Sequence, residues 1–256
     1  MLVAGFPSAV FATNVYIVAP GPGEECIVVD PGMEVVAGVD DLLREHRLRP
    51  VAVLLTHGHL DHTFSVVPVA GSRGIPAYIH PDDRELLADP MKGLGRDSAQ
   101  MFGGRLEWQE PDDVALLDDG AVMSIAGLDV TVDHAPGHTP GSVMFRLPGA
   151  PDALNGLDVE PSQTVLSGDV LFAGSIGRTD LPGGSHEQML DSLRAKVLPL
   201  TDDALVLPGH GGATTVGHER ATNPFLVDLG GPLGDSRGDS PGVRVGAGPR
   251  PPTKGL

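Results

Sequence analysis

The stretch His57-Gly58-His59-Leu60-Asp61-His62 places three imidazoles and one carboxylate within six residues. It directly follows the apolar run Val51-Ala52-Val53-Leu54-Leu55, and such an unbroken run is typical of a strand that is buried on both faces of a sheet. The loop that leaves this strand therefore presents four side chains able to bind a metal ion. Neutral imidazole and carboxylate suit zinc and iron, so this cluster predicts a metal site rather than a polar loop that is rich in histidine by chance.

The composition fits one large folded domain without membrane spans. The chain has 256 residues, of which 41% are hydrophobic and 20% charged, enough to bury a sizeable core. No apolar stretch approaches the ~20 residues that a membrane span needs, and residues 1–7 lack the basic region of a signal peptide. The single cysteine, Cys26, excludes an internal disulfide, fits a reducing compartment and lies in an apolar run that predicts core packing. We therefore expect a cytoplasmic protein.

The charge balance limits the class of partner. With 34 acidic and 17 basic residues, the formal net charge is -17, and such a surface repels the phosphates of nucleic acids. The sequence thus predicts a small-molecule substrate, with neither nucleic acid nor a membrane as partner. No pattern in it predicts an oligomeric state.

Short apolar runs, turns and amphipathic stretches alternate in the first half of the chain. The segment 35–47 carries apolar residues at helical spacing, a strand is expected at 77–79, and the early acids of 82–87 suit the positive end of a short helix. Residues 90–113 have little pattern and contain the only tryptophan, Trp108. They are expected to form a flexible excursion near the mouth of the site or a plain surface loop.

The second half has a different periodicity. From Ala121 the apolar residues recur at every second position, which predicts a second sheet built of hairpins, with 148–163 as a long hairpin loop. Within 185–197 a capping box, Ser-x-x-Gln, opens a helix. The chain is therefore predicted to comprise one domain over 1–228 and a disordered, low-complexity tail over 229–256.

Three further apolar runs also end in a side chain that can bind metal, and glycines beside them allow the sharp turns by which such side chains converge. The candidate metal-binding residues are His57, His59, Asp61, His62, His138, Asp169 and His210. Seven ligands are too many for one tetrahedral zinc, which takes three or four from the protein. They suit two ions about 3.5–4 Å apart that share a bridging carboxylate and a water.

These motifs resemble the metallo-β-lactamase superfamily, and within it the short glyoxalase II-like hydrolases. The chain carries HxHxDH at 57–62, Gly-His-Thr-Pro-Gly-Ser at 137–142, Ser-Gly-Asp at 167–169 and Pro-Gly-His at 208–210. The resemblance extends from the first strand to Asn223-Pro224-Phe225. It implies an α+β fold, the four-layer αββα sandwich, with the metals at one edge.

The resemblance also implies which residues hold which ion. One set is His57, His59 and His138, the other is Asp61, His62 and His210, and Asp169 bridges the two. The spacing agrees, since the first two histidines can face one ion from an extended loop while the next two ligands turn to its neighbour. The expected cofactor is two Zn²⁺ per chain, with iron and manganese as alternatives. Asp61 and Asp169 are the predicted catalytic residues.

A dinuclear site of this kind predicts hydrolysis. Two cations lower the pKa of a shared water and give hydroxide at neutral pH; the hydroxide attacks a carbonyl carbon whose oxygen a metal polarises. A thioester suits such a site because its thiolate leaves without a strong general acid. No Ser-His-Asp or Cys-His nucleophile is apparent. The predicted function is metal-dependent thioester hydrolysis, similar to that of hydroxyacylglutathione hydrolase.

Arg178 is the candidate substrate-binding residue. It lies in a Gly-Arg-Thr-Asp segment that resembles a signature of short glyoxalase II-like enzymes and of persulfide dioxygenases, and its planar guanidinium suits a carboxylate. An ion pair with Asp180 is the alternative role. Glutathione-specific glyoxalases carry Lys and Tyr in the comparable segment, and a long helical extension where this chain has only 211–222. Both departures indicate either a thiol carrier other than glutathione or a less specific recognition of the carrier.

Two other functions are weighed against thioester hydrolysis. A mononuclear iron persulfide dioxygenase shares the fold and would use His57 or His59 with His138 and Asp169. A non-catalytic, metal-stabilised binding protein is the other, although the intact ligand set argues against it. A secretory lactamase and a nuclease are disfavoured by the N-terminus and by the acidic surface.

The remaining polar residues of interest have supporting roles. Asp30 is expected either to accept a hydrogen bond from a ligand imidazole or to cap a turn. His134 is expected to pack in the core or beside the site. Surface or structural roles are predicted for the other histidines, which are His46, His80, His186 and His218.

Overall fold

The first four residues of the apolar run at 51–55 belong to β4 (Arg49–Leu54), which lies inside a six-stranded sheet, and Leu55 directly follows this strand. Val53 and Leu55 pack in the core under the helices that cover this sheet, whereas Ala52 and Leu54 pack in the core between the two sheets of the molecule. Burial on both faces explains why the run is apolar without alternation.

The computed structural model describes residues 1–95, 108–152 and 161–230. The first sheet has the order β1-β2-β3-β4-β5-β6, with β1 (Leu2–Pro7), β2 (Asn14–Ala19), β3 (Glu25–Val29), β5 (Ala77–Ile79) and β6 (Val114–Leu116). The second has the order β14-β13-β10-β9-β8-β7, with β7 (Val122–Ile125), β8 (Leu128–His134), β9 (Val143–Pro148), β10 (Gln163–Gly168), β13 (Leu205–Pro208) and β14 (Thr214–Thr215). A small ribbon pairs β11 (Leu171–Phe172) with β12 (Ser175–Ile176).

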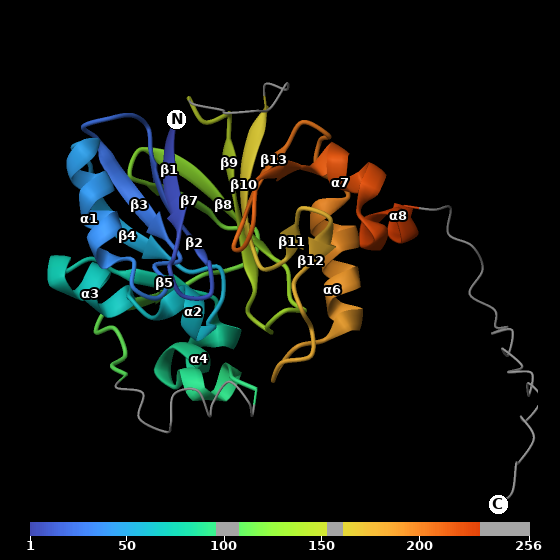
Figure 1. Cartoon of the computed structure of the whole chain (residues 1–256), viewed down its shortest axis with the longest axis horizontal. Coiled ribbons are helices and arrows are strands. Elements are labelled where there is room, and N and C mark those ends of the chain that lie inside the picture. The colour runs from blue at the N-terminus through green and yellow to red at the C-terminus, as the bar shows by residue number, and fades with distance from the viewer. Residues whose placement is uncertain (96–107, 153–160, 231–256) are drawn as a thin grey trace, which may run out of the picture.

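Helices cover the outer faces of both sheets (Figure 1). The first sheet is covered by α1 (Val36–Glu45) and α3 (Val66–Ala70), the second by α6 (His186–Ser192), α7 (Val216–Thr222) and α8 (Pro224–Gly230). The shorter elements are α2 (Leu60–Thr63), α4 (Arg84–Ala88), the 3₁₀ turns η1 (Gly71–Arg73), η2 (Pro81–Asp83) and η3 (Pro90–Gly93), and the π-helical turn η4 (Leu193–Val197). The predicted four-layer αββα sandwich is confirmed.

Several local predictions are also confirmed. The strands β7, β8, β9 and β10 pair antiparallel in succession, as expected for hairpins. Ser185 caps α6 by accepting a hydrogen bond from the Gln188 amide at 3.3 Å. Cys26 is buried in the core under the helices of the first sheet. In the part of the chain that the structure describes, no helix has the length and apolar character needed to cross a membrane.

Other elements differ from expectation. The segment predicted as one helix at 82–87 is split into η2 and α4, and the helix that Ser185 caps becomes π-helical from Leu193. Trp108 donates a hydrogen bond to the Leu87 carbonyl at 2.9 Å and packs on the core rather than in a free loop. The helix α8 includes the first two residues assigned to the tail. The rest of that tail and the middle of the 148–163 loop lie outside the described residues.

Candidate metal centre

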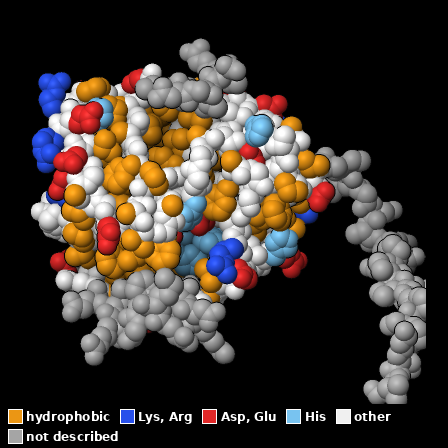
Figure 2. Space-filling model, in the orientation of Figure 1, with side chains coloured by type: hydrophobic (Ala, Val, Ile, Leu, Met, Phe, Trp, Pro, Cys, Tyr) orange, Lys and Arg blue, Asp and Glu red, His pale blue; other side chains and the backbone are white. Residues whose placement is uncertain are grey.

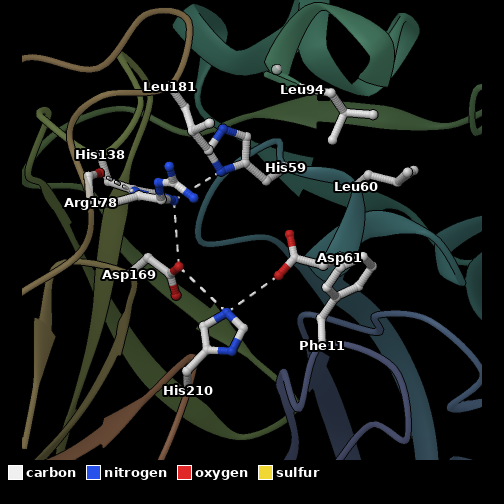
Figure 3. A pocket seen from close by; sticks show the side chains of 11 residues that line it. Phe11, His59, Leu60, Asp61, Leu94, His138, Asp169, Arg178, Leu181 and His210 are labelled. Atoms are coloured by element: carbon white, nitrogen blue, oxygen red, sulfur yellow. Dashed lines mark hydrogen bonds and ion pairs between the residues drawn. The ribbon is translucent and has the colours of Figure 1, made fainter. Parts of the chain in front are cut away.

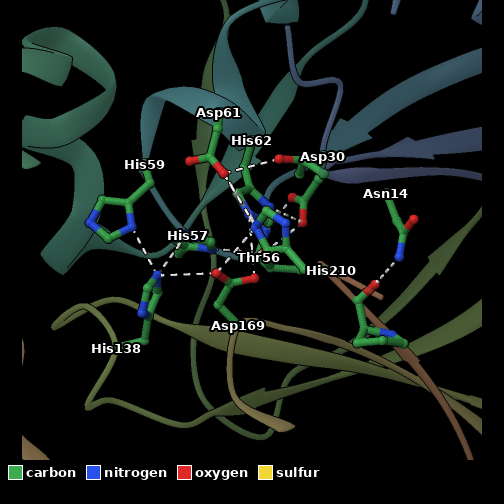
Figure 4. Close-up of polar contacts among 12 residues, drawn as sticks. Asn14, Asp30, Thr56, His57, His59, Asp61, His62, His138, Asp169 and His210 are labelled. Carbon is green, nitrogen blue, oxygen red and sulfur yellow. Dashed lines mark hydrogen bonds and ion pairs between the residues drawn. The ribbon is translucent and has the colours of Figure 1, made fainter. Parts of the chain in front are cut away.

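The seven candidate ligands leave the ends of different elements and meet at one edge of the sandwich (Figure 4). The loop after β4 carries His57 and His59, and α2 carries Asp61 and His62. The turn after β8, the end of β10 and the end of β13 supply the other three, which are His138, Asp169 and His210. The first sheet and its following helix thus provide four of the seven residues, and the second sheet provides three.

Three imidazoles form the first group. His138 Nε2 lies 2.8 Å from His59 Nδ1 and 3.2 Å from His57 Nε2, and all three rings are buried. Burial, together with the neighbouring imidazoles, lowers the pKa of His57 well below its ordinary value and that of His59 to about 3. The rings of His57 and His59 are therefore neutral, which is the state in which histidine binds a metal.

A carboxylate and two imidazoles form the second group. Asp61 Oδ2 lies 3.5 Å from His62 Nε2 and 3.3 Å from His210 Nε2, and the two nitrogens are 3.3 Å apart. A tetrahedral ion with bonds of about 2.1 Å holds its ligand atoms about 3.4 Å from one another. The three atoms thus have the spacing that a single tetrahedral ion requires.

Asp169 lies between the two groups. Its Oδ2 is 3.4 Å from His138 Nε2 and 3.5 Å from His210 Nε2, and its Oδ1 is 3.4 Å from His62 Nε2. Oδ1 is buried and has no hydrogen-bond partner among the described residues. A buried carboxylate oxygen without a partner is costly, and two adjacent cations would satisfy it. Asp169 thus lies beside residues of both groups, and its role as the bridging ligand stays a prediction.

The second group attracts positive charge. Burial alone would lower the pKa of His62, but the carboxylates of Asp61, Asp169 and Asp30 reverse that effect and raise it well above its ordinary value. Burial would likewise raise the pKa of Asp61, yet His62 and His210 hold it below the usual range. Together with the spacing of the ligand atoms, these charges show that the residues fit a pair of divalent ions.

Asp30 supports the second group from behind. It has a left-handed backbone, with φ of 51°, directly after β3. Its Oδ1 accepts a hydrogen bond from the Thr56 amide at 2.8 Å, while its Oδ2 accepts one from the Thr56 hydroxyl at 2.6 Å and lies 2.9 Å from His62 Nδ1. Of the two roles expected for Asp30, the contact with an imidazole is therefore formed, and it orients the ring of His62.

The comparisons with known proteins agree with this architecture. The family model described as the metallo-beta-lactamase superfamily matches residues 9–156. The chain belongs to the metallo-beta-lactamase superfamily. An uncharacterized protein of Mycobacterium tuberculosis is 46% identical over 90% of this chain and 99% of its own length. The hydroxyacylglutathione hydrolase GloC of Haemophilus influenzae is 34% identical over 78% of this chain and 86% of its own.

Two solved structures are similar over most of the chain. The B3 metallo-beta-lactamase BLEG-1 is 36% identical, with a TM-score of 0.71, and the match covers 88% of this chain and 99% of that one. The protein TTHA1623, solved in a di-iron-bound form, is 35% identical, with a TM-score of 0.66 and coverage of 87% and 100%. With the two ligand groups, these relatives support a metal-dependent hydrolase of the superfamily.

A pocket opens onto both groups (Figure 3). Its apolar wall is formed by Phe11, Leu60, Leu94 and Leu181, which surround His59, Asp61, His138, Asp169 and His210. On the molecular surface, histidine side chains are visible in a hollow beside basic and acidic side chains (Figure 2). Because Leu94 belongs to the predicted 90–113 excursion, the described start of that segment does lie at the site mouth.

Arg178 lines the same pocket, but its guanidinium is paired with a neighbouring carboxylate. It donates two hydrogen bonds of 2.8 Å to the carboxylate of Asp180, and both side chains are exposed. The ion pair expected as the alternative role is therefore formed, and a contact with substrate stays a prediction. The Arg178 carbonyl has a role that the sequence did not reveal, since it lies 2.7 Å from His138 Nδ1 and orients that ring.

The β1–β2 hairpin positions the His210 loop, another role that the sequence did not reveal. Asn14 donates hydrogen bonds of 2.9 Å to the carbonyls of Pro208 and Gly211, and the Tyr16 hydroxyl donates one of 2.8 Å to Pro208. These partners are almost two hundred residues apart in sequence, so no local pattern could have indicated the contact.

The remaining histidines form no second metal centre in the described part of the chain. His80 and His134 come within reach of Asp82, but their rings stack at 3.9 Å with an interplanar angle of 12°. Each imidazole lone pair lies in its own ring plane, and two nearly parallel planes do not meet at one ion. His134 Nε2 instead lies 2.9 Å from the Pro140 carbonyl, which agrees with packing beside the site. His186 and His218 are exposed.

Proposed function

We propose that the chain is a dinuclear metal-dependent hydrolase of thioesters. The observation that carries this proposal is the chemistry of the pocket wall. Among the described residues, the titratable side chains that line the pocket are Arg178, Asp169 and members of the two ligand groups. None of them is a separate acid able to protonate a leaving group. A thiolate leaves without one because its conjugate thiol has a pKa of about 8.5, whereas an alkoxide or an amide nitrogen does not.

The first group would hold one divalent ion and the second group another, and Asp169, which lies between the two groups, is the residue placed to bind both. When bound, such ions lower the pKa of a shared water and polarise the carbonyl oxygen of the substrate. The protein itself supplies orientation and water exclusion. Asp30 and the Thr13 hydroxyl, which donates to Asp61 Oδ2 at 3.0 Å, fix ligands of the second group, and the leucines of the wall shield the acyl group from solvent.

The relatives support hydrolysis and leave the substrate to be tested. GloC is named a hydroxyacylglutathione hydrolase, which favours a thioester, whereas BLEG-1 is named a beta-lactamase, which makes a β-lactam the second candidate. The persulfide dioxygenase alternative needs one iron, and the presence of two complete three-ligand groups argues against it.

The decisive experiment compares matched substrates on protein of known metal content. Zinc-, iron- and manganese-loaded protein would be assayed with acyl-glutathione and acyl-coenzyme A thioesters, with an oxygen ester of the same acyl group, with a β-lactam, and for persulfide-dependent oxygen uptake. We expect two ions per chain and turnover of a thioester, with the oxygen ester much slower because its leaving group needs a proton. Equal rates on both esters, or activity confined to the β-lactam or the persulfide, would contradict the proposal.

A further inference from the structure

A carboxylate outside the seven ligands joins the two loops that carry the first group. Asp83, at the end of η2, is fully buried. Its Oδ2 accepts a hydrogen bond from the Gly58 amide at 2.8 Å and another from the Thr139 hydroxyl at 2.6 Å, and its Oδ1 accepts one from the Gly141 amide at 2.7 Å. The buried charge is thus satisfied by three donors, as a buried carboxylate must be.

These donors lie next to the three imidazoles of the first group. Gly58 is the residue between His57 and His59, and Thr139 directly follows His138. One loop leaves the first sheet and the other leaves the second, so a single side chain connects the parts of the chain that bring the imidazoles together. The approach is close: a Cβ atom at Gly141 would lie 2.6 Å from the Asp83 amide nitrogen and 2.7 Å from its carboxyl carbon.

We propose that Asp83 is a positioning residue that fixes the spacing of the first group. It corresponds in its action to Asp30, which orients His62 in the second group. Each of these two carboxylates thus stabilises the geometry of one ligand group. This inference rests on the metal-binding part of the proposed function and is independent of the thioester substrate.

Because Asp83 supports only the first group, we predict that Asp83→Asn weakens metal binding at that group and not at the second. An amide group cannot accept from all three donors, because its NH₂ must face at least one of them. Loss of such a supporting contact weakens metal binding by about 10–100-fold. In a cobalt(II) titration of the full chain, we expect one ion to bind as in the wild type and the other to bind about 10–100-fold more weakly.

Proton NMR of the cobalt protein identifies the affected group. With one equivalent of cobalt, Asp83→Asn should lack the three shifted, exchangeable imidazole N–H signals of His57, His59 and His138 and retain the two of His62 and His210. Asp30→Asn should show the opposite pattern. Asp82→Asn, an exposed neighbour, is the matched control and should leave both affinities unchanged.

Thr139→Val provides a milder test that does not depend on the folding of Asp83→Asn. It removes one donor, keeps the side-chain shape and should weaken the same ion by a smaller factor. Unchanged cobalt affinities in both variants, or an equal loss at both sites, would overturn the inference. A wild-type protein that binds no cobalt would instead contradict the proposed function.

Discussion

Replacing Gly209 by alanine tests how closely the two ligand groups are packed. A Cβ atom at Gly209 would lie 2.3 Å from Asp169 Oδ1 and 2.7 Å from His62 Cε1. The first distance is about 1 Å short of ordinary contact, and both neighbours are buried between other ligands, so the carboxylate has to move. A displacement of about 1 Å at a reacting centre costs about 10²-fold in rate, which corresponds to about 2.7 kcal/mol.

The assay is kcat/KM on the substrate that the wild type turns over, with metal content measured on the same sample. We expect Gly209→Ala to lose about 10²-fold in kcat/KM while its far-UV circular dichroism stays native. Gly212→Ala is the matched control, because a Cβ atom there meets no other atom within 4 Å. Wild-type activity and metal content in Gly209→Ala would refute the close packing of Asp169 against this turn.

Three further predictions concern single side chains. Asp169→Ala should abolish activity and lower the metal content below two ions per chain, and retention of both ions by elemental analysis would contradict bridging. Arg178→Ala should raise KM for an anionic thioester more than it lowers kcat; an unchanged KM would leave the ion pair with Asp180 as its role. Burial raises the pKa of Cys26 from near 9 to about 12, so Ellman's reagent should not label the native protein at pH 8. Rapid labelling of the native thiol would contradict its burial. Because the folded chain holds the thiol proton more tightly than the unfolded chain, the free energy of unfolding should fall as pH rises above about 9. Urea midpoints measured at pH 8 and pH 10 can show this fall.

The sequence predicted the parts of the site that depend on strand ends. Apolar runs that stop at His57, Asp169 and His210 indicate buried strands with ligands at their termini, and the structure brings these residues to one edge. The secondary structure of the turn that brings Asp61 and His62 into the second group was harder to predict. It is the helix α2, whose four residues are too few to show a helical period.

Apart from the contact of Asp30 with His62, the contacts that hold the ligands in place could not be predicted. Asp83 and Asn14 are common turn and strand-end residues, and their importance depends on partners that only the folded chain brings near, such as Thr139 and Pro208. No local sequence pattern indicates such pairs, because the partners are far apart along the chain. The ion pair of Arg178 with Asp180 was predictable because it spans only two residues.

The origin of the ligands on two different sheets has a consequence for stability. Neither sheet alone carries a complete set, since His138 completes the first group and His210 completes the second. Ions can therefore bind tightly only when the two sheets are packed face to face. Binding of an ion at a free concentration one thousand times its Kd stabilises this packed state by about 4 kcal/mol. Chelation should loosen the apolar layer between the sheets, and hydrogen exchange in β4 and β10 would then report metal occupancy from well inside the protein.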